Sequence, residues 1–203
     1  TNEWSQDDRN FIKDTIAPEV RISAPALNSE VMATVNVTGT CEAGLNVDLF
    51  LTGRGSLGST SCINGAFTMP AQLAGTDGTK NIVAQQTDLA GNTGNDNRNI
   101  IKDSVAPRVV ISTPTSGSIT RTGTRITGTC ETGYNVVIGG SGVGSNTTVA
   151  CTNGQFASDV SYSSGDGAKQ VTVSQSDRAG NIGQDSRSFV RDGTSPVIVI
   201  TDP

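Results

Sequence analysis

The sequence predicts an all-β protein that consists of two tandem β-sandwich modules, each of about seven strands. The chain of 203 residues repeats itself in one register, because Cys41 and Cys130 lie 89 residues apart and so do Pro18 and Pro107. Apolar residues alternate with polar ones in short runs, and turn residues interrupt the runs about every 8–12 residues. No segment shows sustained helical periodicity. A repeat this regular indicates an array of modules, each able to bury one small core.

Seven apolar runs follow one another in the first module. In chain order they are marked by Val20 and Ile22, Val35 and Val37, Val47 to Leu51, the segment that ends at Cys62, Phe67 and Met69, Ile82 and Ala84, and Arg98 to Ile101. Asn64 and Gly65 separate the fourth run from the fifth and predict a tight hairpin, because both residues tolerate positive φ. Seven short strands in a module of about 90 residues are typical of an immunoglobulin-like sandwich, although the core tryptophan of antibody domains is absent.

The register of the repeat also predicts the module boundaries. Residues 1–14 correspond to the last strand of a preceding repeat, 15–103 to the first module, 104–192 to the second, and 193–203 to the first strand of a following repeat. Phe11, Ile12 and the run from Val197 to Ile200 are apolar, and exposed apolar strands tend to pair with sheet edges. We therefore expect one or both terminal strands to pack on a neighbouring chain or on an adjacent module.

Each module carries two cysteines, which are 21 residues apart. Of the three possible pairings, only Cys41 with Cys62 and Cys130 with Cys151 repeats the same bridge in both modules. One disulfide in a small domain is typical of proteins from oxidising compartments. The alternatives are free buried thiols and, less favoured, a zinc site, since the chain has no C-x-x-C spacing and no histidine.

The composition argues against several classes of function. The net charge is −5 and no basic stretch occurs, so nucleic acid and anionic membrane surfaces are poor candidates as partners. No apolar run is long enough to span a membrane. Without histidine the chain lacks the usual general base, and we expect no enzyme activity. Aromatic residues make up only 4% of the chain, too few for a platform that stacks sugars or bases.

Four short motifs recur in both modules, namely Asp-x-x-Ala-Pro at the joint, Gly-Thr-Cys-Glu-x-Gly, Asn-Gly-x-Phe and Asp-x-Ala-Gly-Asn. Together they resemble the bacterial Ig-like repeats of large surface adhesins, over almost the whole chain. The cysteine pair is a variation on that pattern. The resemblance implies an extracellular location at the bacterial cell surface, a place in a long stalk, and adjacent repeats as partners. It also implies calcium at the joints between modules.

Acidic and amide side chains gather at one pole of each module if the predicted strands alternate in direction. The candidate ligands are Asp14, Asp88 and Asn92, repeated at Asp103, Asp177 and Asn181, with Glu42 and Glu131 in a neighbouring loop. Calcium prefers such oxygen ligands, and the resemblance implies a calcium site here. The alternative is structural, because the same aspartates can accept backbone N–H bonds in tight turns. Asp77 and Asp166, each before a glycine, are expected in hairpin turns at the other pole, facing the next joint.

We expect a non-catalytic segment of a bacterial cell-surface adhesin or fibre, whose tandem modules act as a stalk or spacer in adhesion. The alternatives are a ligand-binding tip, a strand-exchanged filament subunit and an accessory region of a secreted enzyme. A tip would bind a host or surface receptor through the loop that differs most between the copies, Gly53 to Ser59 against Gly139 to Ser145.

Overall fold

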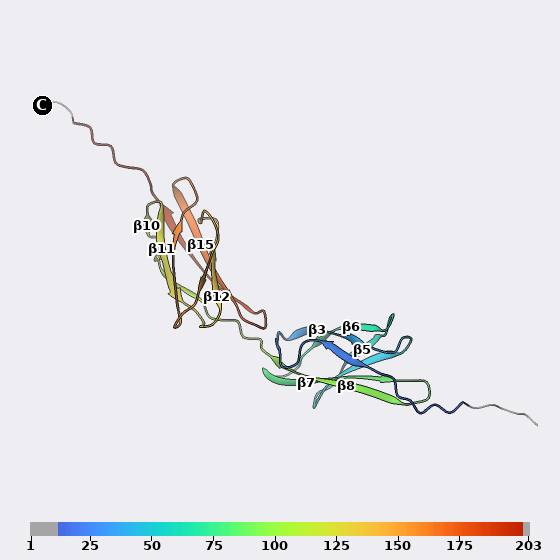
Figure 1. Ribbon diagram of the computed structural model, residues 1–203. Coiled ribbons are helices and arrows are strands. Elements are labelled where there is room, and N and C mark those ends of the chain that lie inside the picture. The colour runs from blue at the N-terminus through green and yellow to red at the C-terminus, as the bar shows by residue number, and fades with distance from the viewer. Residues whose placement is uncertain (1–11, 201–203) are drawn as a thin grey trace, which may run out of the picture. The chain divides into compact units, whose positions relative to one another are not determined.

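The computed structural model describes residues 12–200, and every regular element in that range is a β-strand. The chain divides into two compact units, Thr1–Asp103 and Ser104–Pro203. Each unit pairs a three-stranded sheet with a five-stranded sheet (Figure 1). This confirms the predicted class, two immunoglobulin-like β-sandwiches in tandem. No helix that could cross a membrane occurs among residues 12–200.

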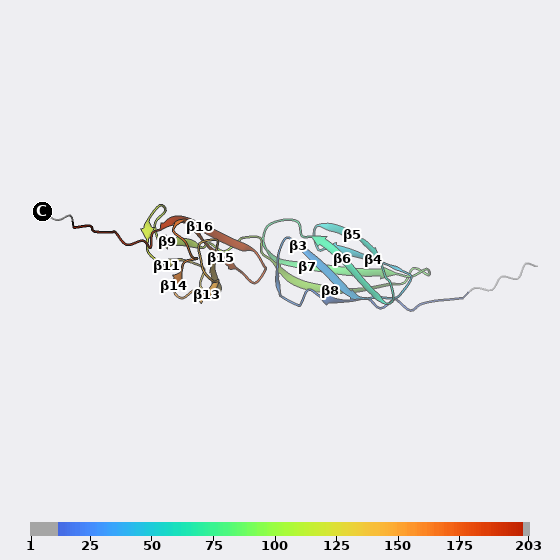
Figure 2. The same ribbon diagram turned by 90° about the horizontal axis from the view of Figure 1, so that it is seen from above.

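The first module has eight strands in its described part. They are β1 (Arg21–Ala24), β2 (Glu30–Val31), β3 (Thr34–Thr40), β4 (Asn46–Leu51), β5 (Gly55–Ser61), β6 (Ala66–Gln72), β7 (Gly78–Thr87) and β8 (Thr93–Lys102). One sheet has the order β1-β3-β6 and the other has the order β2-β8-β7-β4-β5 (Figure 2). Neighbouring strands are antiparallel, except that β2 runs parallel to β8.

The second module repeats this topology strand for strand. Its strands are β9 (Val110–Thr113), β10 (Ile119–Thr120), β11 (Gly123–Thr129), β12 (Asn135–Gly139), β13 (Thr147–Ala150), β14 (Gln155–Ser161), β15 (Gly167–Ser176) and β16 (Ile182–Arg191). The sheet orders are β14-β11-β9 and β10-β16-β15-β12-β13. The parallel pair recurs as β10 beside β16.

The core of each module lies between its two sheets, because the apolar residues of each strand alternate with exposed ones. In β6, for example, Phe67, Met69 and Ala71 are buried while their neighbours face solvent. Val47 and Leu49 of β4 are fully buried. Each such large apolar side chain contributes about 1.5–3 kcal/mol on leaving water, so the alternation supplies the energy that holds the sheets together.

Two of the repeated motifs meet in one contact. A Cβ on Gly39 would lie 2.0 Å from the carbonyl oxygen of Arg21 and 2.5 Å from Cε1 of Phe67. Gly128 has the same relation to Val110 and Phe156. Glycine is therefore required two residues before the first cysteine of each module. The ring of Phe67 lies against Gly39, and the ring of Phe156 lies against Gly128, too close for any larger residue.

Both predicted disulfides form. Cys41 follows β3 and Cys62 follows β5, with Cα atoms 5.9 Å apart; Cys130 and Cys151 repeat the bridge at 6.0 Å. No cysteine is left free. Each bridge joins the two sheets of its module, because β3 and β5 belong to different sheets.

The structure differs from the sequence prediction in two elements. The two-residue strands β2 and β10 were not predicted, because a run so short leaves no alternation to detect. Asn64 and Gly65 adopt the predicted positive φ angles of 53° and 78°, but their turn joins strands of different sheets. Only Ile63 and Ala66 pair across it. The tight turn therefore forms as predicted, but the strands on its two sides separate, because β5 pairs with β4 and β6 pairs with β3.

The terminal apolar segments do not pair with the described sheets. Residues from Val197 to Ile200 are 75–90% exposed, and Ile12 is 96% exposed. The expectation that a terminal strand packs on an adjacent module stays a prediction. Phe11 lies outside the described residues. Pairing of a terminal strand with a neighbouring chain stays a prediction.

Candidate functional site at the acidic pole

The turn between β7 and β8 places the first two predicted ligands together. Oδ1 of Asp88 accepts the Asn92 N–H at 2.8 Å, and Oδ2 accepts the Asn92 side-chain amide, also at 2.8 Å. Gly91 supplies the positive φ of 91° that the turn requires. Asp177 and Asn181 repeat both bonds at 2.8 and 2.9 Å in the second module. Both carboxylates thus act as local scaffolds of the Asp-x-Ala-Gly-Asn turn.

These hydrogen bonds change the acidity of the two carboxyl groups. The side-chain bond from Asn92, followed by backbone N–H bonds in the same turn, lowers the pKa of Asp88. For Asp177, desolvation raises the pKa, but the combined bonds from Asn181 and the turn backbone outweigh it and the pKa is lowered. Hydrogen bonds to the ionised form favour that form, so both groups are charged at neutral pH.

The joint aspartates make a second, smaller turn. Oδ1 of Asp14 accepts the Ile16 N–H at 3.0 Å, and Asp192, two repeats later, accepts the Thr194 N–H at 3.1 Å. The carbonyl oxygen of Asp14 accepts the Asn92 side-chain amide at 3.3 Å. Asp14, Asp88 and Asn92 are therefore brought together, as predicted from strand direction.

Asp103 follows β8 in the first unit, where its N–H donates to the carbonyl oxygen of Val31 at 2.9 Å. Asp177 and Asn181 belong to the second unit. Of the second predicted group, the structure brings these two together through the hydrogen bonds of their turn.

A buried glutamine that the sequence analysis missed holds the neighbouring loop. Gln86 is fully buried; its Oε1 accepts the Glu42 N–H at 2.9 Å and its Nε2 donates to the Glu42 carbonyl oxygen at 2.8 Å. Gln175 makes the same pair of bonds with Glu131 at 2.9 and 2.8 Å. The available signal was an amide at an inward position of β7 and again of β15, where apolar residues alternate.

Glu42, Asp14 and Asp88 line a hollow of about 600 Å³ at this pole of the first module, together with the exposed Leu89 and the loop backbone. The hollow is open and acidic. Yet within residues 12–200 no three acidic, histidine or cysteine side chains come close enough to hold a metal ion. Both oxygens of Asp88 are also engaged in the turn. In the described arrangement the carboxylates of Asp14 and Asp88 accept hydrogen bonds of their own turns, and a calcium site at this pole stays a prediction.

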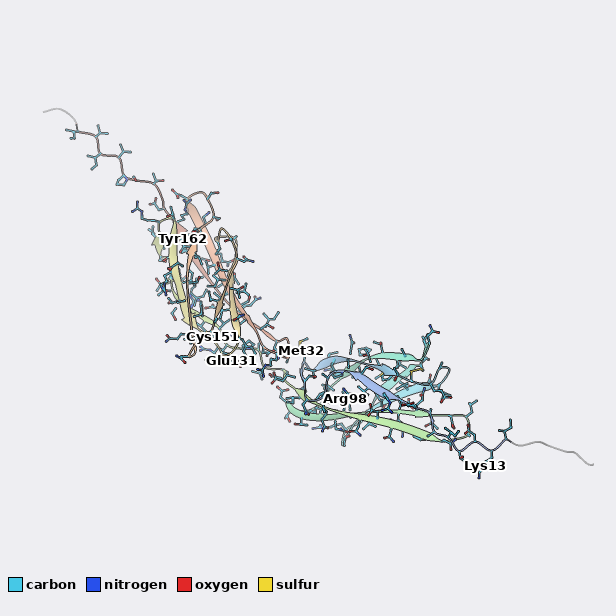
Figure 3. All side chains as sticks on the ribbon, viewed as in Figure 1. Lys13, Met32, Arg98, Glu131, Cys151 and Tyr162 are labelled. Carbon is cyan, nitrogen blue, oxygen red and sulfur yellow. A yellow bond between two sulfur atoms is a disulfide. The ribbon has the colours of Figure 1, made fainter. Side chains whose placement is uncertain are left out.

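The corresponding pole of the second module carries Glu131 beside the disulfide. Figure 3 shows Glu131 and Cys151 at one end of this module and Tyr162 at the opposite end. At that opposite end lies Asp166, which was expected to face the next joint. Its carboxylate accepts the Gly193 N–H at 2.9 Å and the Thr194 hydroxyl at 2.7 Å. The Thr194 bond is the main cause of the lowered pKa of Asp166.

Asp77 occupies the equivalent position in the first module. Its Oδ1 lies 3.0 Å from the ammonium group of Lys102, which also donates to the Gly75 carbonyl oxygen at 2.7 Å. Lys102 is 7% exposed, so this ion pair fixes the end of β8. Both aspartates therefore anchor the chain where it leaves a module.

Comparison with known proteins identifies a family for one module. Residues 112–192 match the family model described as bacterial Ig domain. No curated protein matches the sequence. Among solved structures, the chain is similar to a tetra-tandem repeat in the extending region of a large adhesion protein, with 20% identity and a TM-score of 0.39; the match covers 88% of this chain and 50% of that one. The chain thus spans half the length of that structure.

Two further solved structures are similar to this chain, both at a lower sequence identity than the adhesion-protein repeat. A 1.5-MDa bacterial ice-binding adhesin shares 18% identity at a TM-score of 0.41, over 88% of this chain and 66% of that one. A chimeric titin Z1Z2 shares 12% identity at a TM-score of 0.37, over 90% of this chain and 100% of that one. Residues 112–192 therefore match the bacterial Ig domain family, and the first module repeats the second in sequence and in strand topology.

Proposed function

We propose that the chain is a non-catalytic segment of a bacterial cell-surface adhesin or fibre, in which tandem modules act as a stalk or spacer. The observation that carries the proposal is that the connection between modules repeats along with the core. Asp14 and Asp192 make the same turn at positions two repeats apart. Strict repetition of module and connection suits a part whose contribution is length, whereas one active site would need no such repetition.

The two disulfides support an extracellular location, because disulfides persist in oxidising surroundings and are rare in the cytosol. The partners of a stalk are the adjacent repeats of its own chain, and a receptor would be bound by another part of the protein. Our proposal for this segment therefore includes no receptor of its own.

A ligand-binding tip is the main alternative, and the variable loop is where it would act. In the second module this loop folds back on its own sheet. The Gly142 N–H donates to the Gln170 carbonyl oxygen at 2.8 Å, the Ser163 N–H donates to the Gly142 carbonyl oxygen at 2.9 Å, and Val143 is 9% exposed. A loop used to pack its own module favours the spacer over the tip.

An exchange experiment separates the two functions. In the surface protein that contains this segment, residues 15–103 are deleted in register, and in a second variant they are replaced by an unrelated Ig-like module of similar length. The stalk proposal expects weaker cell attachment after deletion and recovery after replacement. Failure of the unrelated module to restore attachment would support specific binding by these residues.

Calcium at the acidic pole stays a separate proposal, because the present hydrogen bonds occupy the candidate ligands. A calcium ion would have to compete with the turn N–H groups for the carboxylates of Asp14 and Asp88. The melting temperature of the two-module chain measured in calcium and in a chelator tests it. A higher melting temperature in calcium, absent when Asp88 and Asp177 are both changed to alanine, would support calcium; equal values would leave only the structural role.

A further inference from the structure

The leading segment of the first module, defined here as residues 18–31, runs beside β8 in the same direction. Contacts follow one another in order along both strands. Pro18 lies against Gly94, Ile22 against Asp96 and Arg98, Asn28 against Asn99, Ser29 against Ile101, and Val31 against Asp103. The segment by which the chain enters the module therefore lies parallel to β8, the strand by which the chain leaves the module.

Asp96 and Arg98 tie β1 to β8 although the two strands belong to different sheets. The Ile22 N–H donates to Oδ2 of Asp96 at 2.8 Å. The guanidinium group of Arg98, labelled in Figure 3, donates to the carbonyl oxygens of Ile22 and Pro25. The side chains of Asp96 and Arg98 thus form hydrogen bonds with backbone groups that a neighbouring strand would otherwise satisfy. We call this pair the Asp-Arg clamp.

The clamp residues stand where core residues would be expected. β8 alternates, and Gly94, Asp96 and Arg98 share its inward face with the buried Ile100. Partly buried charges cost free energy unless they are hydrogen-bonded. Their position is explained by the backbone groups of β1 that they satisfy, which would otherwise lie at an open sheet edge.

Backbone contacts continue the link on both sides of the clamp. A Cβ on Gly94 would lie 1.8 Å from the Pro18 carbonyl oxygen, so only glycine permits this approach. Beyond the clamp, three backbone hydrogen bonds of 2.8–2.9 Å run from Asn28 to Asn99, from Ile101 to Ser29 and from Asp103 to Val31, donor first.

The second module repeats these contacts 89 residues later, with one difference. Where Nη1 of Arg98 donates to the Pro25 carbonyl oxygen, Nη1 of Arg187 donates to Oδ1 of Asp185 and to the Ser186 carbonyl oxygen, each at 3.3 Å. The Ile111 N–H donates to Asp185 at 2.8 Å, and Arg187 donates to the Ile111 carbonyl oxygen at 3.0 Å. A Cβ on Gly183 would lie 1.8 Å from the Pro107 carbonyl oxygen. The three backbone bonds recur, donor first, as Gly117 to Ser188, Val190 to Ser118 and Asp192 to Thr120.

The parallel direction decides how this link responds to tension. A pull on the two ends of a module draws the leading segment backwards at Pro18 and draws β8 forwards at Asp103. The two strands then slide along each other, and all their contacts are loaded together instead of opening one after another. Antiparallel pairs such as β4 and β5 lie outside this path.

We propose that the leading segment and the last strand form the load-bearing link of each module, with the Asp-Arg clamp as its side-chain component. This inference rests on the proposed stalk function, since only a stalk is pulled from its ends. The clamp resists force because its hydrogen bonds, which involve charged groups, break before the sheets separate.

The two-module chain held by its ends in a constant-force instrument tests the inference. The clamp variant carries Asp96→Ala and Asp185→Ala. The control carries Val47→Ala and Val136→Ala, which remove fully buried side chains from β4 and β12, outside the link. Thermal unfolding of both variants is measured first, so that their unfolding rates under force are compared at known losses of stability.

We expect the clamp variant to unfold about tenfold faster than wild type at the same force, since a hydrogen bond to a charged group is lost before the transition state. The control should show a smaller acceleration for an equal fall in melting temperature. If the variant with Asp96→Ala and Asp185→Ala does not fold, the variant with Arg98→Ala and Arg187→Ala replaces it. A third variant, with Asp96→Asn and Asp185→Asn, keeps a hydrogen-bond acceptor at each position. It should unfold more slowly under force than either alanine variant.

Equal acceleration in the clamp variant and the control would overturn the inference, because the clamp would then contribute only ordinary stability. That result would leave the stalk proposal untouched, because the module exchange tests that proposal separately. Failure of the module exchange, in turn, would remove the stalk while leaving the measured mechanical difference in place.

Discussion

Asp88 and Asp177 stabilise their turns more strongly in the ionised form than in the protonated form. Their pKa values are lowered from the ordinary 3.8 by bonds from the turn that follows each of them. A carboxyl group whose pKa is lower in the folded state contributes stability above its unfolded pKa, and loses it as pH falls through the folded value.

The melting temperature of the wild-type chain should therefore be steady near neutral pH and fall below about pH 4. The double variant Asp88→Ala, Asp177→Ala should melt lower at pH 7 and lose less on acidification, because the titrating groups are gone. Thermal unfolding followed by circular dichroism across that range measures both. Parallel curves for the two proteins would mean that these carboxylates do not govern acid stability.

Gln86 satisfies both backbone groups of Glu42 in a partly buried loop. Gln86→Leu keeps the volume but leaves an N–H and a carbonyl oxygen without their partner, at about 1–3 kcal/mol for each. The variant Gln85→Leu, on the opposite face of the same strand, serves as control. Chemical denaturation should show a clear loss for Gln86→Leu alone; similar losses would point to a general intolerance of leucine in β7.

At the scale of the strand, the outcome of the sequence prediction depends on how much pattern each element contains. Runs such as Val47 to Leu51 alternate over several residues, and the repeat shows each of them twice, so their strands and both disulfides were predictable. β2 and β10 have two residues each and are defined by their parallel partner. No local signal marks them, since the pairing is set by contacts some 70 residues away in the chain.

The acidic pole and the clamp show the same division. The turn formed by Asp88 and Asn92 is predictable because its residues are close together in the sequence. Gln86 and Arg98, in contrast, act on the backbone of distant segments, and their only sequence signal is a polar residue at an inward strand position. The turn at Asn64 was predicted from its residue types, but the pairing of the next strand, β6, with β3 depends on contacts distant in the sequence, such as that of Phe67 with Gly39.

Each disulfide closes a loop of 21 residues that joins the two sheets of its module. In the chain-entropy model, loss of such a bridge costs about 3 kcal/mol. Denaturation with and without a reducing agent should show both modules weakened by a similar amount. An unchanged midpoint on full reduction, confirmed by counting thiols, would mean that the cores hold the modules together without the bridges.

At the scale of the whole molecule, a repeated module with a repeated connection is expected to add length. Within each module the chain enters beside the strand by which it leaves, running in the same direction, so successive modules can be joined without the chain doubling back. In the proposed stalk, the Asp-Arg clamp and the disulfides would keep each module folded under tension.

Small-angle X-ray scattering of chains with two and four modules, the longer made by joining two copies of residues 15–192, tests the central claim most directly. A stalk predicts that the maximum dimension in solution rises by the same amount for each added module. A four-module chain that is compact, with little increase in maximum dimension over the two-module chain, would contradict the account.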